Sequence, residues 1–217
     1  MFKAVIFDLD GTILDTIEDI AESMNRVLKK HGYETHYVEE YKYFAGDGMR
    51  TLAYRSLPED KRDEANVNRF YELMREEYGK SLDVKTHPFP GIEETLKELC
   101  GLGVKINVLS NKPHDFTVEV VKKYFGGIKF DVIMGESKSC PKKPDPSGAI
   151  GIAEKLNIAA VEFVYVGDTD TDMKTAVNAG MYPLGVSWGF RLPRELVENG
   201  AAIVISKPSA IVELFRP

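Results

Sequence analysis

The sequence has few cysteines: Cys100 and Cys140 are the only two among 217 residues. Two isolated cysteines cannot form the disulfide framework that stabilises many small secreted domains. No apolar run approaches the roughly 18 residues needed to cross a bilayer, and Asp8 and Asp10 interrupt the apolar run near the N-terminus. We therefore expect a cytoplasmic protein with no signal peptide and no membrane partner.

Basic side chains are also in the minority. The chain has 28 Lys and Arg against 34 Asp and Glu, which gives a formal net charge of −6. Because proteins bind nucleic acid phosphates through clustered Lys and Arg, we do not expect nucleic acid as a partner. A small anionic substrate is still compatible with this charge, since it needs only a few local charges or a metal ion. The length allows one domain, or one domain with a smaller insert.

Short apolar segments alternate with helical ones along most of the chain. The apolar segments are nearly continuous in hydrophobicity and rich in Val and Ile, as expected for strands covered on both faces. This alternation predicts an α/β fold with a Rossmann-like parallel sheet. The expected strands are residues 3–8, 104–110, 130–135, 162–168, 182–187 and 201–206, and the helices between them lie near 91–101, 113–124, 146–156, 170–179 and 193–198.

One long interval breaks this alternation, because residues 16–82 contain no convincing strand. Its first part spaces apolar residues along one helix face and places Gly32 where the helix should end. We predict an all-helical unit over 16–82, inserted after the first strand of a core formed by 1–15 and 83–217. The segments with helical patterns are residues 16–32, 47–57 and 60–82.

Polar side chains stand where the predicted strands end. In an open parallel sheet, ligands bind beyond the carboxyl ends of the strands, so these side chains should converge. We interpret Lys142 as a solvated lysine and Asp170 as a helix N-cap. The full set is Asp8 and Asp10 after the first strand, Ser110, Asn111 and Lys112 after the second, Asp168, Asp170 and Asp172 after the strand at 162–168, and Lys142 and Lys143 before the helix at 146–156.

The chemistry of this set points to phosphoryl transfer. Facing carboxylates repel one another, and a cation removes that cost. All-oxygen ligands suit Mg²⁺ better than zinc. One carboxylate can attack phosphorus to form an aspartyl-phosphate, and a second can act as general acid and base. A lysine and a hydroxyl can stabilise the transferring group. The acidic cluster therefore predicts a metal-dependent phosphoryl-transfer site.

Four motifs, "DLDGT", "SNK", "KPDP" and "GDTDTD", occur in this order at the predicted strand ends. Together they resemble the motifs of the haloacid dehalogenase (HAD) superfamily, over essentially the whole chain. The helical insert after "DLDGT" resembles the C1-type cap of that superfamily. The stretches "FDLDGTILDTIEDIAESMNRVL", "GDGMRTL" and the late "SWGF" and "ELVENGAAIVISKPSAIVEL" resemble its phosphoglycolate phosphatase branch.

The resemblance implies a role for each motif residue. Asp8 would be the nucleophile, and Asp10 would be the acid and base and would offer its backbone carbonyl to the metal. Lys143 would balance the charge around Asp8 and the phosphate. The implied Mg²⁺ ligands are Asp8, Asp10, Asp168 and Asp172, the last in a supporting position, and the implied substrate-binding residues are Gly11, Thr12, Ser110, Asn111 and Lys143.

A further candidate lies in the helical insert. In "FAGDGMRTLAYRSL", Gly46 and Gly48 precede a predicted helix, where backbone N–H groups can approach an anion. Arg50 would lie in the first turn of this helix and could reach the carboxylate of a small acid. The alternative is that Arg50 is a solvated helix residue and that the glycines only shape a loop.

These patterns predict a Mg²⁺-dependent phosphatase acting on a small phosphorylated metabolite such as 2-phosphoglycolate. A sugar phosphomutase of the β-phosphoglucomutase kind is an alternative, although such relatives usually carry a histidine soon after the D-[ST] pair, and "DTIEDIAES" has none. Pyrophosphate or a nucleoside monophosphate as substrate also stays open, as does the choice between monomer and homodimer. A phosphoacceptor switch of the response-regulator type would need neither Asp10 nor the insert.

Overall fold

A six-stranded sheet forms the centre of the computed structural model, which describes residues 1–216. The strand order is β5-β4-β1-β6-β7-β8, and every neighbouring pair is parallel. This confirms the α/β fold with a parallel sheet. The strands are β1 (Ala4–Phe7), β4 (Lys105–Pro113), β5 (Val132–Glu136), β6 (Phe163–Gly167), β7 (Tyr182–Val186) and β8 (Ile203–Ile205).

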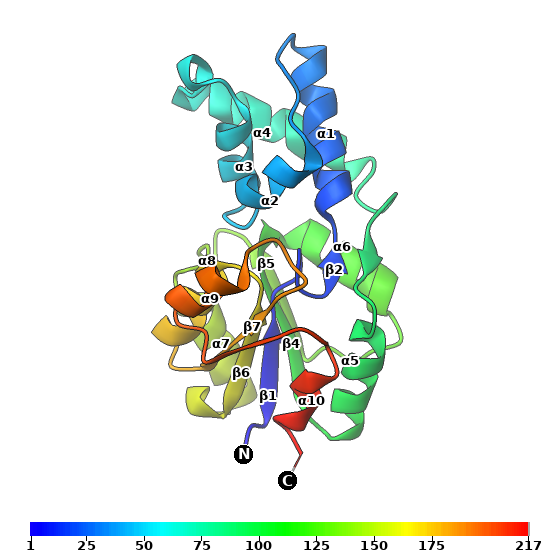
Figure 1. Cartoon of the computed structure of the whole chain (residues 1–217), viewed down its shortest axis with the longest axis vertical. Helices are drawn as coiled ribbons and strands as arrows, with labels where there is room; N and C mark the ends of the chain where they lie inside the picture. The colour runs from blue at the N-terminus through cyan, green and yellow to red at the C-terminus, as the bar shows by residue number, and fades with distance from the viewer. Residues whose placement is uncertain (217) are drawn as a thin grey trace.

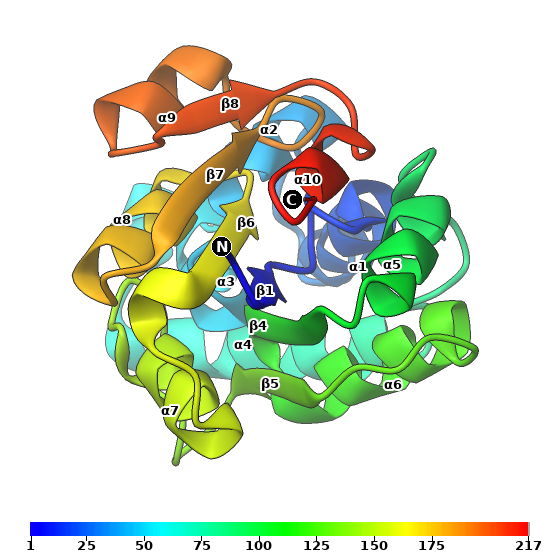
Figure 2. The same ribbon diagram turned by 90° about the horizontal axis from the view of Figure 1, so that it is seen from below.

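Helices cover both faces of this sheet (Figure 2). Because neither face meets water, all four residues of β1 are fully buried, with Val5 and Phe7 in one hydrophobic cluster and Ala4 and Ile6 in another. This explains the continuous apolar runs in the sequence. One face carries α5 (Ile92–Gly101), α6 (His114–Phe125) and α10 (Ala210–Glu213), the other carries α7 (Ser147–Leu156) and α8 (Asp170–Asn178), and α9 (Pro193–Glu198) packs beside β7 and β8.

The order of the strands brings three strand ends together. The chain places β4 and β5 on one side of β1, then crosses to place β6, β7 and β8 on the other side. The carboxyl ends of β4, β1 and β6 are therefore neighbours at the point where the winding direction reverses. Such a switch point is the usual place for a ligand in an open parallel sheet.

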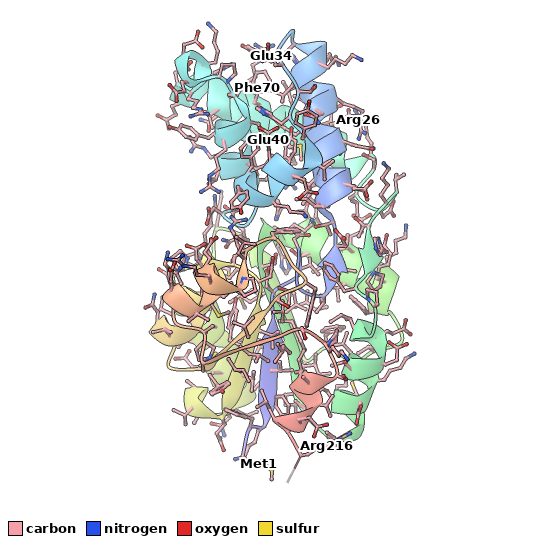
Figure 3. All side chains as sticks on the ribbon, in the orientation of Figure 1. Met1, Arg26, Glu34, Glu40, Phe70 and Arg216 are labelled. Carbon is pink, nitrogen blue, oxygen red and sulfur yellow. The ribbon has the colours of Figure 1, made fainter. Side chains whose placement is uncertain are left out.

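Four helices form a separate layer above these carboxyl ends, which we call the helical layer (residues 17–79) (Figure 1). Met1 and Arg216 lie at the opposite end of the molecule (Figure 3). The hydrophobic cluster that contains Phe7 continues into this layer as far as Met24 and Phe70. The four helices are α1 (Ile17–Lys30), α2 (Val38–Phe44), α3 (Met49–Ser56) and α4 (Glu64–Gly79). Within residues 1–216, no helix has the length and apolar character needed to cross a membrane.

The first helix of the layer shows why its sequence forms a helix. In α1, acidic Glu18 and Asp19 lie in the first turn, and basic Lys29 and Lys30 lie in the last, as the helix dipole favours. The helix ends at His31, and Gly32 follows with φ +76°. The buried apolar residues repeat along one face, as the sequence pattern predicts: they are Ile17, Ile20, Ala21, Met24, Val27 and Leu28.

Two short strands connect the helical layer to the sheet. Strand β2 (Leu14–Asp15) pairs antiparallel with β3 (His87–Pro88), so the chain leaves and re-enters the core at the same place. Neither this pair nor helix α2 is predicted from the sequence. The helix expected over residues 60–82 is shorter, because α4 covers Glu64–Gly79 and a single 3₁₀ turn at Glu59–Lys61 precedes it.

Candidate active site

Three acidic side chains converge where the strands of the sheet end. Asp8 follows β1, Asp168 follows β6, and Asp172 lies in the first turn of α8. One carboxylate oxygen from each lies within 4.8 Å of the others, and all three residues are buried.

A buried lysine joins two of these acids. The Nζ of Lys143 lies 2.6 Å from Oδ1 of Asp8 and 2.6 Å from Oδ1 of Asp172. Burial alone would lower the pKa of Lys143, but the charges of Asp172 and Asp8 raise this pKa well above its usual value, so the side chain stays an ammonium ion. The neighbouring Lys142 is partly exposed and pairs with Glu136 instead.

The acidic cluster holds more negative than positive charge. Three carboxylates face one ammonium group. Burial, together with Asp172 and Asp168, raises the pKa of Asp8 well above its usual value although Lys143 opposes this. Burial and then Asp172 raise the pKa of Asp168 to about 7. A divalent cation with oxygen ligands fits this donor set, because it would neutralise the excess charge.

Hydrogen bonds orient the two acids that lie beyond β6. The Thr12 hydroxyl donates to Oδ1 of Asp168 at 2.8 Å, and the Phe190 N–H donates to Oδ2 at 2.8 Å. The N–H and the hydroxyl of Thr169 donate to Oδ2 of Asp172 at 3.0 and 2.7 Å. The directions of both carboxylates are therefore set by the protein itself.

The interpretation of Asp170 as a helix N-cap is wrong, because Thr169 occupies that position. Thr169 has an extended backbone, and its side chain accepts a hydrogen bond from the N–H of Asp172. Asp170 is the first residue of α8, where it pairs with Lys174 at 2.6 Å on the surface of the helix.

Two glycines pack directly against Asp168. Gly11 has φ +90°, and a Cβ there would lie 2.3 Å from Oδ2 of Asp168. A Cβ on Gly189 would lie 2.3 Å from Cβ of the same residue. Gly11 is one of the residues expected at the site, but Gly189 is not, since its only signal in the sequence is its place in "SWGF" directly after the β7 segment.

Asp10 faces a different partner, Lys112, which the sequence analysis left without a role. The Nζ of Lys112 lies 2.9 and 3.2 Å from the two carboxylate oxygens of Asp10. It also donates to the hydroxyl of Tyr78, in α4 of the helical layer, at 2.7 Å. The available signal was its place directly after Ser110 and Asn111 in the same motif.

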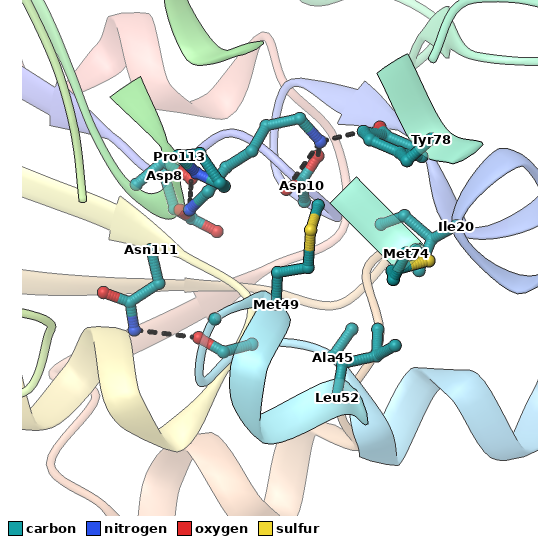
Figure 4. A pocket seen from close by; sticks show the side chains of 14 residues that line it. Asp8, Asp10, Ile20, Ala45, Met49, Leu52, Met74, Tyr78, Asn111 and Pro113 are labelled. Atoms are coloured by element: carbon teal, nitrogen blue, oxygen red, sulfur yellow. Dashed lines mark hydrogen bonds and ion pairs between the residues drawn. The ribbon is translucent and has the colours of Figure 1, made fainter. Parts of the chain in front are cut away.

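The side chain of Asn111 holds three segments together. Its Oδ1 accepts from the N–H of Lys143 at 2.8 Å, and its Nδ2 donates to the carbonyl of Lys143 at 3.1 Å and to that of Gly46 at 3.0 Å. The last bond, drawn in Figure 4, connects β4 to the loop before α3. Ser110 is buried beside it, and its hydroxyl accepts from the N–H of Lys112.

A cavity of about 50 Å³ lies between the sheet and the helical layer. Its two walls differ in polarity: the sheet side is polar, and the helical layer contributes mostly apolar side chains, with Met49 pointing toward Asp10 (Figure 4). The sheet side consists of Asp8, Asp10, Ser110, Asn111, Lys112 and Pro113, and the helical layer contributes Ile20, Ala45, Gly46, Gly48, Met49, Leu52, Met74 and Tyr78.

The structure does not bring Arg50 to this cavity. Arg50 is exposed, and its Nε donates to Oδ1 of Asn68 in α4 at 2.8 Å. Because successive residues of a helix point about 100° apart, Met49 faces the cavity and Arg50 points away from it. Gly46 and Gly48 do line the cavity, with φ values of +106° and +86°.

Known proteins resemble this chain over nearly its whole length. The family described as haloacid dehalogenase-like hydrolase matches residues 5–186. A protein of Aquifex aeolicus named phosphoglycolate phosphatase is 30% identical, over 98% of this chain and 96% of the relative. A phosphoglycolate phosphatase of Pseudomonas syringae pv. tomato is 30% identical, over 94% of this chain and 76% of the relative. A solved structure from Lactobacillus delbrueckii subsp. bulgaricus, described as a candidate phosphoglycolate phosphatase, has a TM-score of 0.92 and 31% identity. The match covers 99% of this chain and 98% of the other.

Proposed function

The chain belongs to the haloacid dehalogenase-like hydrolase family and is a phosphoric monoester hydrolase, and we propose that it hydrolyses a small phosphomonoester with Mg²⁺ through an aspartyl-phosphate on Asp8. One observation carries this proposal: two acids at the end of β1 have different surroundings. Asp8 contacts Lys143 beside the other buried acids, whereas Asp10 contacts Lys112 at the cavity. One acid is thus suited to attack phosphorus and the other to transfer a proton.

The residues present fit a bound Mg²⁺. We assign Asp8, Asp168 and the backbone carbonyl of Asp10 as ligands, with Asp172 in support through water. Among residues 1–216, the donors to Asp168 are the neutral Thr12 hydroxyl and Phe190 N–H, whereas Asp172 already has the charged Lys143 on Oδ1. Asp168 is therefore the acid with more charge left to neutralise. When bound, the ion would neutralise charge on these acids and on the phosphoryl oxygens.

The two acids would then divide the reaction between them. An oxygen of Asp8 attacks phosphorus and forms a bond to it, while the bond from phosphorus to the ester oxygen breaks and Asp10 gives that oxygen its proton. In the second step, Asp10 takes a proton from water as the water oxygen attacks phosphorus. The bond between Asp8 and phosphorus breaks, and inorganic phosphate leaves. Lys143 stabilises the carboxylate form of Asp8 that the first step needs.

The other motif residues would bind or position. We assign the Ser110 hydroxyl, which lies at the cavity, to the transferring phosphoryl group together with Lys143. The side chains of Asn111 and Thr12 already bond to Lys143 and Asp168, so we assign both to the support of those residues. Gly11 would let the chain pass beside the phosphate without striking Asp168.

The helical layer would act as a cap. We propose that residues 16–82 form this cap and that 1–15 and 83–217 form the core. Two contacts support a closed arrangement: Asn111 donates to the carbonyl of Gly46, and Arg191 donates to that of Ala45 at 3.1 Å. Closure over the strand ends would exclude water from the reacting groups.

The names of the relatives make 2-phosphoglycolate the first substrate to test. The test is phosphate release by the purified protein with Mg²⁺, from 2-phosphoglycolate, glucose 1-phosphate, pyrophosphate, a nucleoside monophosphate and p-nitrophenyl phosphate. We expect hydrolysis of p-nitrophenyl phosphate and of at least one small monoester. Conversion of glucose 1-phosphate to an isomer without phosphate release would instead identify a mutase.

Replacing Asp10 tests the division of roles. Asp10→Asn removes the proton donor, so we expect kcat for an alkyl phosphate to fall roughly 10²–10⁴-fold. The loss should be much smaller for p-nitrophenyl phosphate, whose leaving group needs little protonation. Steady-state kinetics with both esters check this, and equal losses on the two would contradict the acid role of Asp10.

A further inference from the structure

Lys112 is the only cationic side chain among the described residues that line the cavity. The arginines of the surrounding segments are engaged elsewhere. Arg50 bonds to Asn68, and Arg55 pairs with Asp47 at 2.6 Å and donates to the carbonyls of Tyr43 and Phe44. The Arg191 guanidinium bonds to backbone carbonyls of the helical layer and to Glu195. A negative charge on the leaving group would therefore meet Lys112 and no other cation on these walls.

We propose that Lys112 selects the leaving group, and that the enzyme prefers phosphate esters of 2-hydroxy acids. This inference rests on the proposed function, because it takes Asp10 as the acid that protonates the ester oxygen. Such an acid must lie within hydrogen-bonding distance of that oxygen. The Nζ of Lys112 lies 2.9 Å from Oδ1 of Asp10, so it is directly beside the place of the ester oxygen.

The position of Lys112 sets which carboxylate can reach it. In the ester of a 2-hydroxy acid, the carboxylate carbon is two bonds from the ester oxygen, so its charge lies close to Asp10 and Lys112. A carboxylate attached further from the ester oxygen of the substrate would instead lie toward the apolar wall. The Tyr78 hydroxyl, which accepts from Nζ at 2.7 Å, holds the lysine in this place from the side of the helical layer.

The opposite wall excludes other leaving groups. Apart from Tyr78, whose hydroxyl contacts Lys112, its larger side chains are Ile20, Met49, Leu52 and Met74, which offer no hydrogen bond donor. A sugar or a second phosphate pressed against this wall would leave polar groups unpaired, which is costly in a buried site. The cavity of about 50 Å³ has room for only a few water molecules, so this arrangement favours a short leaving group over a nucleoside.

Lys112 has a second conceivable role, which the experiment must separate from the first. Its bonds to both oxygens of Asp10 would orient the acid even if the lysine never met the substrate. Orientation of Asp10 matters equally for every ester with a poor leaving group. Recognition of a carboxylate matters only for esters that carry one.

Ethyl phosphate and 2-phosphoglycolate form the matched pair, since a methyl group in one replaces the carboxylate of the other. With saturating Mg²⁺, we expect the wild type to prefer 2-phosphoglycolate in kcat/KM by roughly a hundredfold, as for a buried charge pair. The same enzyme should discriminate against the phosphate ester of 3-hydroxypropionate, whose carboxylate is one carbon further away. Lys112→Met should remove most of the preference over ethyl phosphate, and Lys142→Met, a change of a partly exposed lysine that pairs with Glu136, should keep it.

Each outcome decides a different point. If Lys112→Met lowers kcat/KM equally for ethyl phosphate and 2-phosphoglycolate, Lys112 does not recognise the carboxylate and is a positioning residue for Asp10. Equal kcat/KM for the two esters in the wild type would overturn the inference without any variant, while hydrolysis of p-nitrophenyl phosphate would still support the phosphatase. A wild type that releases phosphate from no ester with Mg²⁺ would contradict the proposed function itself.

Discussion

Asp8→Asn is expected to abolish turnover of every phosphate ester while leaving the fold intact. Asparagine keeps the size of the side chain and an oxygen that can accept from Lys143, but it lacks the charge that attacks phosphorus. The loss in kcat should be at least roughly 10⁴-fold, because no other residue supplies the covalent step. The fold should survive because the change also removes one of three facing carboxylates from a buried site.

Two measurements check this prediction. Steady-state kinetics with p-nitrophenyl phosphate report the chemical step, and thermal unfolding of the metal-free protein reports stability. Asp170→Asn is the matched control, since Asp170 is partly exposed on α8 and, within residues 1–216, pairs with Lys174 alone. We expect this control to match the wild type in both measurements. Substantial turnover by Asp8→Asn would rule out the covalent mechanism.

Removal of the metal is expected to stop the reaction as completely as the Asp8→Asn substitution does. Activity should disappear in excess EDTA and return with Mg²⁺. Ca²⁺ should inhibit, because its larger and looser coordination shell misplaces the phosphoryl group. The physical reason lies in the charges: without the cation, three buried carboxylates share one lysine. Full activity in excess chelator would exclude the metal from the mechanism.

Thermal unfolding tests the metal site without any assay of activity. A ligand that binds only the folded state at a hundredfold excess over its dissociation constant adds about 2.7 kcal/mol to stability. For a chain of this size, that raises the melting temperature by about 5–10 °C. We expect such a rise with Mg²⁺ for the wild type and for Asp170→Asn, and a much smaller one for Asp168→Ala. An equal rise in all three proteins would mean that the ion binds elsewhere.

The sequence was sufficient to predict the sheet because strands that are buried on both faces form continuous apolar runs. Strands such as Phe163–Gly167 are apolar at every position, and the helices between them have regular spacing. The convergence of Asp8 and Asp168 also followed, since the carboxyl ends of neighbouring parallel strands meet at one edge. Helix α2 escaped prediction because only Tyr41 of its seven residues is buried, which is too little for a periodic pattern.

The parts of the site that sequence reasoning missed depend on contacts between distant segments. Lys112 meets Tyr78 only because the helical layer lies over the strand ends, and nothing near Lys112 in the sequence indicates this. Gly189 packs against Asp168 from a loop 21 positions away. The direction of Arg50 depends on how α3 is rotated against the sheet. In each case, the deciding quantity is the placement of one element on another.

The paired strands β2 and β3 have a consequence for how such an enzyme could be rebuilt. Because Leu14 lies opposite Pro88 and Asp15 opposite His87, both ends of the helical layer enter the core side by side. The chain therefore passes between the sheet and the helical layer through this two-stranded stem, while noncovalent contacts such as those of Asn111 with Gly46 and of Lys112 with Tyr78 join the two elsewhere. A helical unit with a differently shaped inner face could be grafted onto this stem without changing the register of β1, β4 or β6. Replacing the helical layer at this stem would therefore change the apolar wall of the cavity and leave the acids and lysines of the sheet in place.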